Sequence, residues 1–458
     1  MPLPESSNDR TLEVDELTRV SLEVLPGLRG TGGDRTTGRE SLCLNVSMAA
    51  TEVQGLQPAP LPFGDDKAAR IAALNGLRGF AVLMVVVVHS SALTEYSWLG
   101  VHSYGPVSLF VLSGFLLYRP WARWILGVTP RPSVRAFAIR RAARIFPAYV
   151  VMFGVWVFVY PPAMPADWRG WVGGATLWSS LQFDRIPSGL VHTWSLGTEL
   201  TWYVVLPVLA VAVWGALSAL RRRHSVRLHA GLLMLSVLVS GTWIWAAEVL
   251  ELANRSLWLP RYLVAFALGA LISMLLEAER VRRAGLGRAR GVISNPVVLG
   301  VVVLLLVAVN ASSLAGSHAA GDPLTFGEDV VRYLSALALA FVLLMAATLA
   351  HPRALVSRLL TARWLQRVGL WSYGVFLWHL PIVVLLWSDF DLRGPGGLAV
   401  TLVVVTLASV LCGAASYTWV ETPTMARSRA YAARFDPARP AGDGQERKGP
   451  APVVSSRP

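Results

Sequence analysis

Residues 71–93 read IAALNGLRGFAVLMVVVVHSSAL, a stretch that is almost wholly apolar and long enough to cross a bilayer. It carries two ionisable side chains, Arg78 and His89. At about 100° per residue, the helical steps between them give roughly three turns plus about 20°, so both lie on one face, about 16 Å apart along the axis. Such groups are costly in hydrocarbon unless they meet a partner or a cavity. The pair indicates a functional site, or else an Arg at the headgroups and a His bonded to a neighbouring helix.

The whole chain shares this apolar character. Its 458 residues are 54% hydrophobic and 15% charged, with a mean hydropathy of +0.51. Apolar stretches of spanning length recur about ten times, near residues 72–93, 104–126, 145–161, 193–216, 228–249, 258–276, 295–315, 330–350, 368–388 and 397–419. The sequence therefore predicts an all-α polytopic membrane protein with its membrane domain at 68–425. The polar flanks, 1–67 and 426–458, are expected to be disordered cytoplasmic tails.

The net charge of +13 is nearly all arginine, since Lys67 and Lys448 are the only lysines. The arginines concentrate in alternate loops, within residues 119–144, 221–227, 280–290 and 353–367. By the positive-inside rule these loops and both termini are cytoplasmic, as an even number of spans requires. No basic and aromatic pattern favours nucleic acid. We therefore expect the lipid bilayer of the cell (plasma) membrane as the partner, and no nucleic acid.

The cysteine content excludes two classes of site. Cys43 and Cys412 lie in different segments, and the chain has no other cysteine. This rules out a disulfide framework and any cysteine-based metal motif. Since no other cluster of metal ligands is visible in the sequence, we expect no metal.

Glu199 lies about one turn into the predicted span 193–216, at the end that the charge pattern assigns to the outer side. His89 lies in the outer part of its own span, so we expect the two side chains at a similar depth. A neutral imidazole in a cavity can accept a proton from a hydroxyl group, and a carboxylate can orient it and stabilise its cation. The alternative is a carboxylate that interacts with the helix N-terminus.

Two further features have competing interpretations. Arg141 and Arg144 are three residues apart and share a helical face, so they can clamp a phosphate; taken alone, anchoring under the positive-inside rule is favoured. His379 lies two residues before Pro381, which has no amide hydrogen to offer the Leu377 carbonyl. This arrangement is either a ligand-lined bend or a packing site, and packing is favoured.

Six segments in chain order resemble motifs of the acyltransferase 3 family of integral membrane O-acyltransferases. They are Arg78 with His89 in the first span, SLFVLSGFL at 108–116, RAARIFP at 141–147, WSLGTELTWY at 194–203, SYGVFLWH at 372–379 and ETP at 421–423. The second segment differs slightly from the family motif, since the family often has one more aromatic residue before the valine. The resemblance runs across almost all of residues 74–425.

The resemblance implies transfer of an acyl group, often acetyl, from acyl-CoA to a hydroxyl of a sugar, glycan or glycosylated small molecule. It also implies that Arg78 and His89 are essential. We expect His89 and Glu199 to be catalytic, with His89 as general base, and three arginines to bind acyl-CoA: Arg78, Arg141 and Arg144. Candidate cavity-lining residues are Ser113, Trp194, Ser195, Tyr203, Tyr373 and His379. Acyl-CoA, expected to be acetyl-CoA, is a donor substrate, and no tightly bound cofactor is expected.

In the mechanism that we expect, acyl-CoA enters from the cytoplasm with its phosphates near Arg141 and Arg144 and its pantetheine arm beside Arg78. The thioester then reaches His89, and Glu199 steadies the imidazolium. A transporter or flippase is the alternative function, because intramembrane Arg, His and Glu side chains also form proton or substrate pathways. That alternative predicts movement of a substrate without consumption of a thioester.

Overall fold

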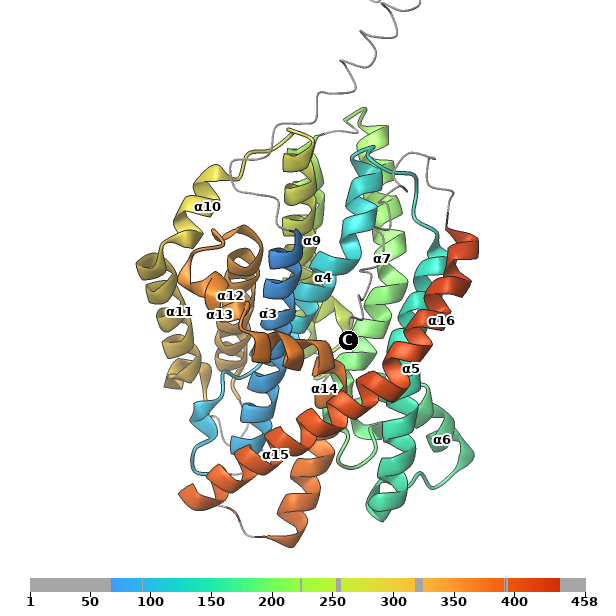
Figure 1. Cartoon of the computed structure of the whole chain (residues 1–458), viewed down its shortest axis with the longest axis vertical. Helices are drawn as coiled ribbons and strands as arrows, with labels where there is room; N and C mark the ends of the chain where they lie inside the picture. The colour runs from blue at the N-terminus through green and yellow to red at the C-terminus, as the bar shows by residue number, and fades with distance from the viewer. Residues whose placement is uncertain are drawn as a thin grey trace, which may run out of the picture. The chain divides into compact units, whose positions relative to one another are not determined.

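The computed structural model describes residues 67–92, 94–222, 225–252, 257–317, 324–390, 392 and 394–436. All regular secondary structure in these ranges is helical (Figure 1). The long helices are α3 (Lys67–Ser91), α4 (Tyr104–Ile125), α5 (Val134–Val159), α7 (Trp194–Ala219), α8 (Val226–Val249), α9 (Leu259–Arg280), α11 (Pro296–Ala311), α12 (Phe326–Leu349), α14 (Arg363–Asp389) and α15 (Pro395–Ser416). The shorter ones are α6 (Trp168–Ala175), α10 (Gly287–Ser294), α13 (Leu355–Leu360) and α16 (Thr422–Ala432).

Nine helical segments of the described ranges are long and apolar enough to cross a bilayer, and each overlaps a stretch predicted from the sequence. The predicted stretch 295–315 differs, because α11 has only 16 residues and follows α10 at a bend of 74°. A helix of that length spans about 24 Å, less than the hydrocarbon thickness of about 30 Å. A tenth span exists only if α10 and α11 form one bent segment. The all-α polytopic fold is confirmed.

The third span begins earlier than its apolar stretch. The sequence predicted it over residues 145–161, whereas α5 begins at Val134. The Ser133 side chain caps the helix by accepting a hydrogen bond of 3.2 Å from the Ala136 amide. The start at 145 was therefore wrong, since hydropathy falls at the arginines although the backbone is already helical. As a result Arg141 and Arg144 lie well inside a helix rather than in a loop before it.

The last helices also run beyond the expected boundary at residue 425. After α15, a π-helical turn (Tyr417–Glu421) leads directly into α16, which ends at Ala432. The ion pair between Arg140 and Asp436, 2.8 Å long, connects this end to α5. The boundary at 425 therefore falls within a helix. The predicted N-terminal tail up to residue 66 and the remainder of the predicted C-terminal tail from 437 lie outside the described residues.

Two helix pairs approach so closely that glycine is required at the contact. Between α3 and α14, a Cβ atom on Gly369 would stand 1.8 Å from the Asn75 carbonyl oxygen. Between α4 and α9, which lie side by side (Figure 1), a Cβ on Gly269 would stand 1.9 Å from the Val111 carbonyl oxygen. Small residues at such contacts let membrane helices pack backbone against backbone. These contacts fix α3 against α14 and α4 against α9.

Buried apolar side chains form two clusters. The first is built mainly from α4, α7, α9 and α12, and the second mainly from α5 and α14. Helix α3 contributes to both, with Leu77 in the first and Val85 in the second. α3 is therefore shared between the two halves of the interior.

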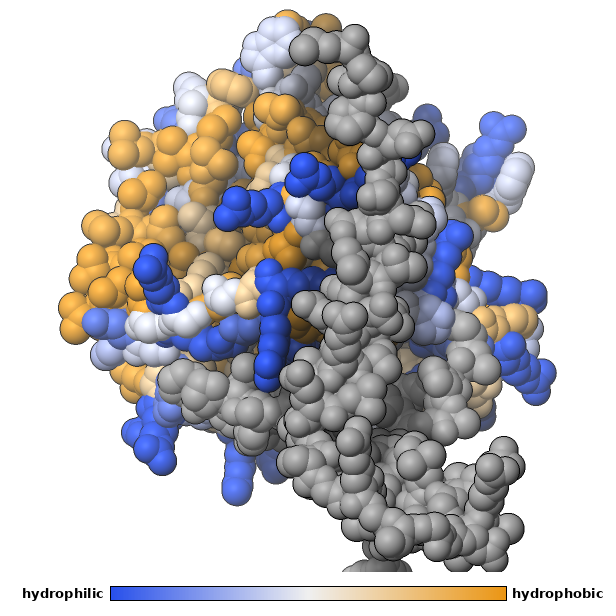
Figure 2. Space-filling model, turned by 90° about the horizontal axis from the view of Figure 1, so that it is seen from above, coloured by the Kyte–Doolittle hydropathy of each residue, from blue (hydrophilic) through white to orange (hydrophobic). Residues whose placement is uncertain are grey.

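Large apolar side chains are also exposed on the outer helices. Examples are Leu238 on α8, Leu304 on α11 and Leu411 on α15. Figure 2, an end-on view, shows hydrophobic surface (orange) around much of the visible periphery and hydrophilic side chains (blue) extending from this end. A surface of this kind suits contact with lipid chains rather than with water.

The glycine contact gives a prediction about stability. Changing Gly369 to Ala should lower the thermal unfolding temperature in detergent, because overpacking of this kind costs about 1–3 kcal/mol. Gly241→Ala in α8 is the control, since a Cβ at Gly241 meets nothing within 4 Å. An unfolding temperature for Gly369→Ala equal to that of the control would contradict the close approach of α3 and α14.

Candidate active site

Five helices enclose a cavity of about 870 Å³, a volume that includes space open to solvent. They are α3, α4, α5, α7 and α14, so both apolar clusters contribute to its walls. The polar lining consists of Arg78, Ser113, Arg141, Arg144, Ser195, Glu199, Tyr203, Ser372 and Tyr373. Most of the other lining residues are leucine and phenylalanine. A largely apolar cavity with a few convergent polar groups is typical of a small-molecule site.

Glu199 is held in the cavity by one of its two carboxylate oxygens. The Ser113 hydroxyl donates to Oε1 at 2.6 Å, and the Tyr203 hydroxyl, one turn further along α7, donates to the same oxygen at 2.8 Å. Within the described chain the second oxygen makes no hydrogen bond, and no arginine forms an ion pair with this carboxylate. Glu199 is therefore fixed in position and retains an oxygen that can accept a hydrogen bond.

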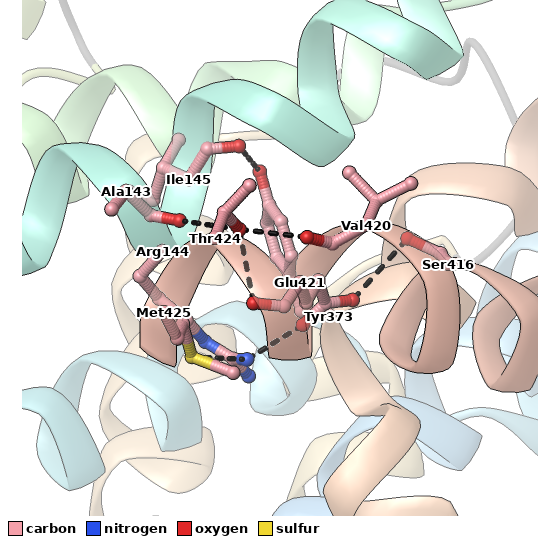
Figure 3. A network of polar contacts seen from close by, with 9 residues as sticks. All are labelled: Ala143, Arg144, Ile145, Tyr373, Ser416, Val420, Glu421, Thr424 and Met425. Carbon is pink, nitrogen blue, oxygen red and sulfur yellow. Dashed lines mark hydrogen bonds and ion pairs between the residues drawn. The ribbon is translucent and has the colours of Figure 1, made fainter. Parts of the chain in front are cut away.

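Arg144 has a buried counter-charge. Its Nη1 lies 2.6 Å from Oε2 of Glu421, whose side chain is only 1% exposed (Figure 3). The Ser416 hydroxyl donates to the other Glu421 oxygen at 3.3 Å, and the guanidinium carbon of Arg144 lies 5.6 Å from the ring centre of Tyr373. The Tyr373 hydroxyl in turn donates to the Ile145 carbonyl at 2.8 Å. This network compensates the charge of Arg144 and fixes its position.

The local backbone explains why Glu421 reaches this point. The π-helical turn Tyr417–Glu421 separates α15 from α16, and Glu421 is its last residue. Such turns insert into α-helices and often occur at functional sites. Pro423 then stands in the first turn of α16, where its missing amide hydrogen costs no helical hydrogen bond. The segment ETP therefore closes the π-helical turn and presents its carboxylate to α5.

Arg78 and Arg141 have no such counter-charge. Neither forms an ion pair or a hydrogen bond within the part of the chain that the structure describes, and the buried Nε of Arg141 has no partner. Arg78 lies within electrostatic range of Glu199 and Glu421, and also of the cation Arg144. The cavity therefore contains two guanidinium groups that remain free to bind an anion.

Beyond one wall of the cavity lies a cluster of three histidines, of which His192 and His379 are buried and His89 is half-buried. Nε2 of His379 is 3.2 Å from Nδ1 of His89, and the ring centres of His379 and His192 are 5.0 Å apart. Phe376 lines the cavity and packs against two of these rings, with centres 5.1 Å from His192 and 5.7 Å from His379. One aromatic side chain therefore connects the cavity to the histidine cluster.

The profile of a family described as an acyltransferase domain (Acyl_transf_3) matches residues 71–418, well over half of the sequence. The chain belongs to the acyltransferase 3 family. Its relatives include the peptidoglycan O-acetyltransferase OatA of Listeria monocytogenes, 23% identical over 377 residues, and the O-acetyltransferase OatA of Staphylococcus aureus, 22% identical over 374 residues. These alignments cover 77% of this chain but 55% and 57% of the relatives, so the chain spans about half their length. No solved structure matches it.

All six motif segments of this acyltransferase 3 chain contribute to the cavity or to the Arg144 network. Eight of the predicted site residues line the cavity: Arg78, Ser113, Arg141, Arg144, Ser195, Glu199, Tyr203 and Tyr373. Three others are not among its lining residues: His89, Trp194 and His379. The two histidines belong to the cluster behind Phe376. Trp194 stacks on Tyr262, with ring centres 5.4 Å apart, and is a packing residue.

The expected neighbour of His89 differs from the observed one. The sequence suggested Glu199, but no hydrogen bond joins these two side chains in the described structure. Glu199 bonds to Ser113 and Tyr203, whereas His89 bonds to His379. The 3-10 turn η5 (Val191–Thr193) before α7 instead brings His192 to the cluster.

Sequence reasoning missed three contributors to the site. His192 was given no role, and Phe376 was not singled out although it lies within the segment 372–379. Glu421 was noted only as part of ETP, without Arg144 as its partner. The sequence held no local signal for these contacts, because each depends on tertiary packing.

The Arg144 network gives a second stability prediction. Changing Glu421 to Gln should destabilise the protein by up to about 3–5 kcal/mol, because it leaves a partly buried guanidinium without its counter-charge. Asp436→Asn is the matched control, since its side chain is 41% exposed and its ion pair with Arg140 contributes at most about 1 kcal/mol. The measurement is the free energy of unfolding of each variant in detergent. Equal destabilisation by the two changes would show that Glu421 does not balance the charge of Arg144.

Proposed function

We propose that the chain is a membrane O-acyltransferase that transfers an acetyl group from acetyl-CoA to a hydroxyl group of a glycan. Membership of the acyltransferase 3 family supports the reaction class. The names of relatives, which include a peptidoglycan O-acetyltransferase, support an acetyl group and a cell-wall glycan. The observation that carries the proposal is the cavity with two unpaired arginines, connected through Phe376 to buried histidines.

The donor binds in the cavity through its phosphates. Coenzyme A carries a pyrophosphate and a further phosphate, and guanidinium groups bind such groups by charge-assisted, forked hydrogen bonds. Among the residues that the structure describes, Arg141 has no ion pair and its buried Nε has no partner, so it contacts a phosphate directly. Arg144 lines the same cavity from its fixed position beside Glu421. Arg78 binds the part of the donor that extends further along α3.

The chemical step is an acyl transfer with His89 as general base. Its imidazole removes the proton from the acceptor hydroxyl, whose oxygen then forms a bond to the thioester carbonyl carbon. The bond between carbonyl carbon and sulfur breaks, and the proton on His89 passes to the departing thiolate of coenzyme A. Glu199 participates from the cavity, where its free carboxylate oxygen accepts a hydrogen bond from the substrate.

The two substrates approach from opposite sides of the membrane. The arginine-rich loops and both termini lie in the cytoplasm, following the positive-inside rule, so the donor enters from that side. The glycan acceptor reaches His89 from the outer leaflet of the plasma membrane, because His89 lies in the outer part of α3. On this proposal the cavity and the histidine cluster are successive parts of one path for the acetyl group.

The first test is transfer of a labelled acetyl group. Purified protein supplied with acetyl-CoA labelled in the acetyl group and with peptidoglycan fragments should yield acetylated glycan and free coenzyme A. His89→Ala should reduce the rate by about 10²- to 10⁴-fold, the usual contribution of a general base. His229→Ala is the control, since this buried histidine bonds to Tyr118 at 2.6 Å, away from the cavity.

Two results would contradict the proposal. Undiminished transfer by a folded His89→Ala protein would exclude His89 as the base. Movement of a glycan or lipid across reconstituted vesicles without release of coenzyme A would favour a transporter or flippase.

A second test separates two adjacent arginines. Arg141→Gln should raise the KM for acetyl-CoA by about tenfold or more, because a hydrogen bond to a charged group contributes about 1.5–3 kcal/mol. Arg140→Gln should leave that KM unchanged, since Arg140 pairs with Asp436 and does not line the cavity. Equal KM values for the two variants would show that Arg141 does not bind the donor and that its charge serves only the membrane topology.

A further inference from the structure

We propose that His379 is the positioning residue for His89, fixing its tautomer and stabilising the cation that forms during transfer. The inference rests on the proposed role of His89 as general base. It assigns to a residue on α14 the task that sequence reasoning gave to Glu199. The argument depends on the two ring nitrogens of each histidine and on the groups that they face.

The tautomer of His379 follows from a backbone carbonyl. Its Nδ1 lies 2.6 Å from the carbonyl oxygen of Phe376. A carbonyl can only accept, so Nδ1 carries the hydrogen and donates it. In the neutral ring Nε2 then has a lone pair and can only accept. His379 is completely buried, and this hydrogen bond holds its ring in a fixed orientation.

The same reasoning applies to His89. Its Nδ1 lies 2.9 Å from the Val85 carbonyl oxygen and 3.2 Å from Nε2 of His379. Both of these groups accept, so Nδ1 of His89 carries the hydrogen. This hydrogen is shared between the two acceptors. The lone pair of His89 is therefore on Nε2, the atom that acts as the base. A second acceptor at Nδ1 also stabilises the imidazolium that forms when Nε2 takes the proton.

The surroundings of the pair contain no closer group for this task. Among the described residues, the titratable side chains that face the pair are each other and His192. Within the described ranges, neither nitrogen of His192 makes a hydrogen bond, and the three rings do not form a metal-binding group. Glu199 is bonded to Ser113 and Tyr203 instead. His379 is therefore the side chain that orients His89.

The close contact between α3 and α14 makes the arrangement rigid. The same two helices that meet at Asn75 and Gly369 bring His89 to His379. A base whose partner sits on a tightly packed helix retains its orientation without a conformational change. At metal sites, removal of the partner that orients a ligating histidine typically costs about 10- to 100-fold in affinity or activity. We expect a loss of that order for the partner of His89.

Two substitutions of His379 separate orientation from packing. An asparagine keeps a donor near the Phe376 carbonyl but has no group at the position of Nε2. A glutamine places an amide oxygen near that position and can accept the hydrogen of His89. We expect kcat to fall by about 10- to 100-fold in His379→Asn and to stay within about fivefold of the wild type in His379→Gln. The KM for acetyl-CoA should be unchanged in both, because His379 does not line the cavity.

The measurements are kcat and KM for labelled acetyl transfer, normalised to folded protein, with His229→Asn as a control for loss of a buried histidine. Equal kcat values in the asparagine and glutamine variants would overturn the inference, whether both remain active or both are lost. A change in KM with unchanged kcat would overturn it as well. Absence of transfer by the wild type would instead refute the proposed function itself, so the two failures are distinguishable.

Discussion

The close contact between α3 and α14 determines where the reactive side chains lie. A glycine at position 369 lets the two backbones meet, and the contact continues along both helices to His89 and His379. Because α3 also carries Arg78 into the cavity, one helix connects the polar cavity with the histidine cluster. Any change that separates α3 from α14 would therefore disturb the proposed base and its partner together. The geometry of the proposed reaction depends on this contact more than on any single polar residue.

The distribution of charge within the membrane domain follows from the high cost of burying unpaired ions. Arg144 is compensated by Glu421, which a π-helical turn directs toward α5. The charge of Glu199 is stabilised differently, by two hydroxyl groups that donate hydrogen bonds to one carboxylate oxygen. Two cations, Arg78 and Arg141, remain without a partner in the described chain. An anionic ligand would supply the missing charge, which is the physical reason for proposing a phosphate-bearing donor.

The sequence predicted the helices and many of the cavity residues because these depend on local patterns. Apolar stretches fix the spans, and helical periodicity puts Arg78 and His89 on one face. Partners depend instead on tertiary packing. His89 meets His379 at a separation of 290 residues, and Arg144 bonds to Glu421 at a separation of 277. Some helix ends were also not predicted, because capping or a bend determines them rather than hydropathy. The start of α5 and the short helix α11 are examples.

The central claim is that the acetyl donor occupies the arginine-lined cavity, next to the histidine cluster. Photo-crosslinking with an acetyl-CoA analogue that carries a diazirine in its pantetheine arm, followed by peptide mapping, tests this claim most directly. The account predicts labels at Arg78 and within residues 105–117, 195–203 and 372–376, and their disappearance when excess acetyl-CoA is added. Labelling confined to lipid-exposed α8 or α11, or labelling that excess acetyl-CoA does not reduce, would contradict it.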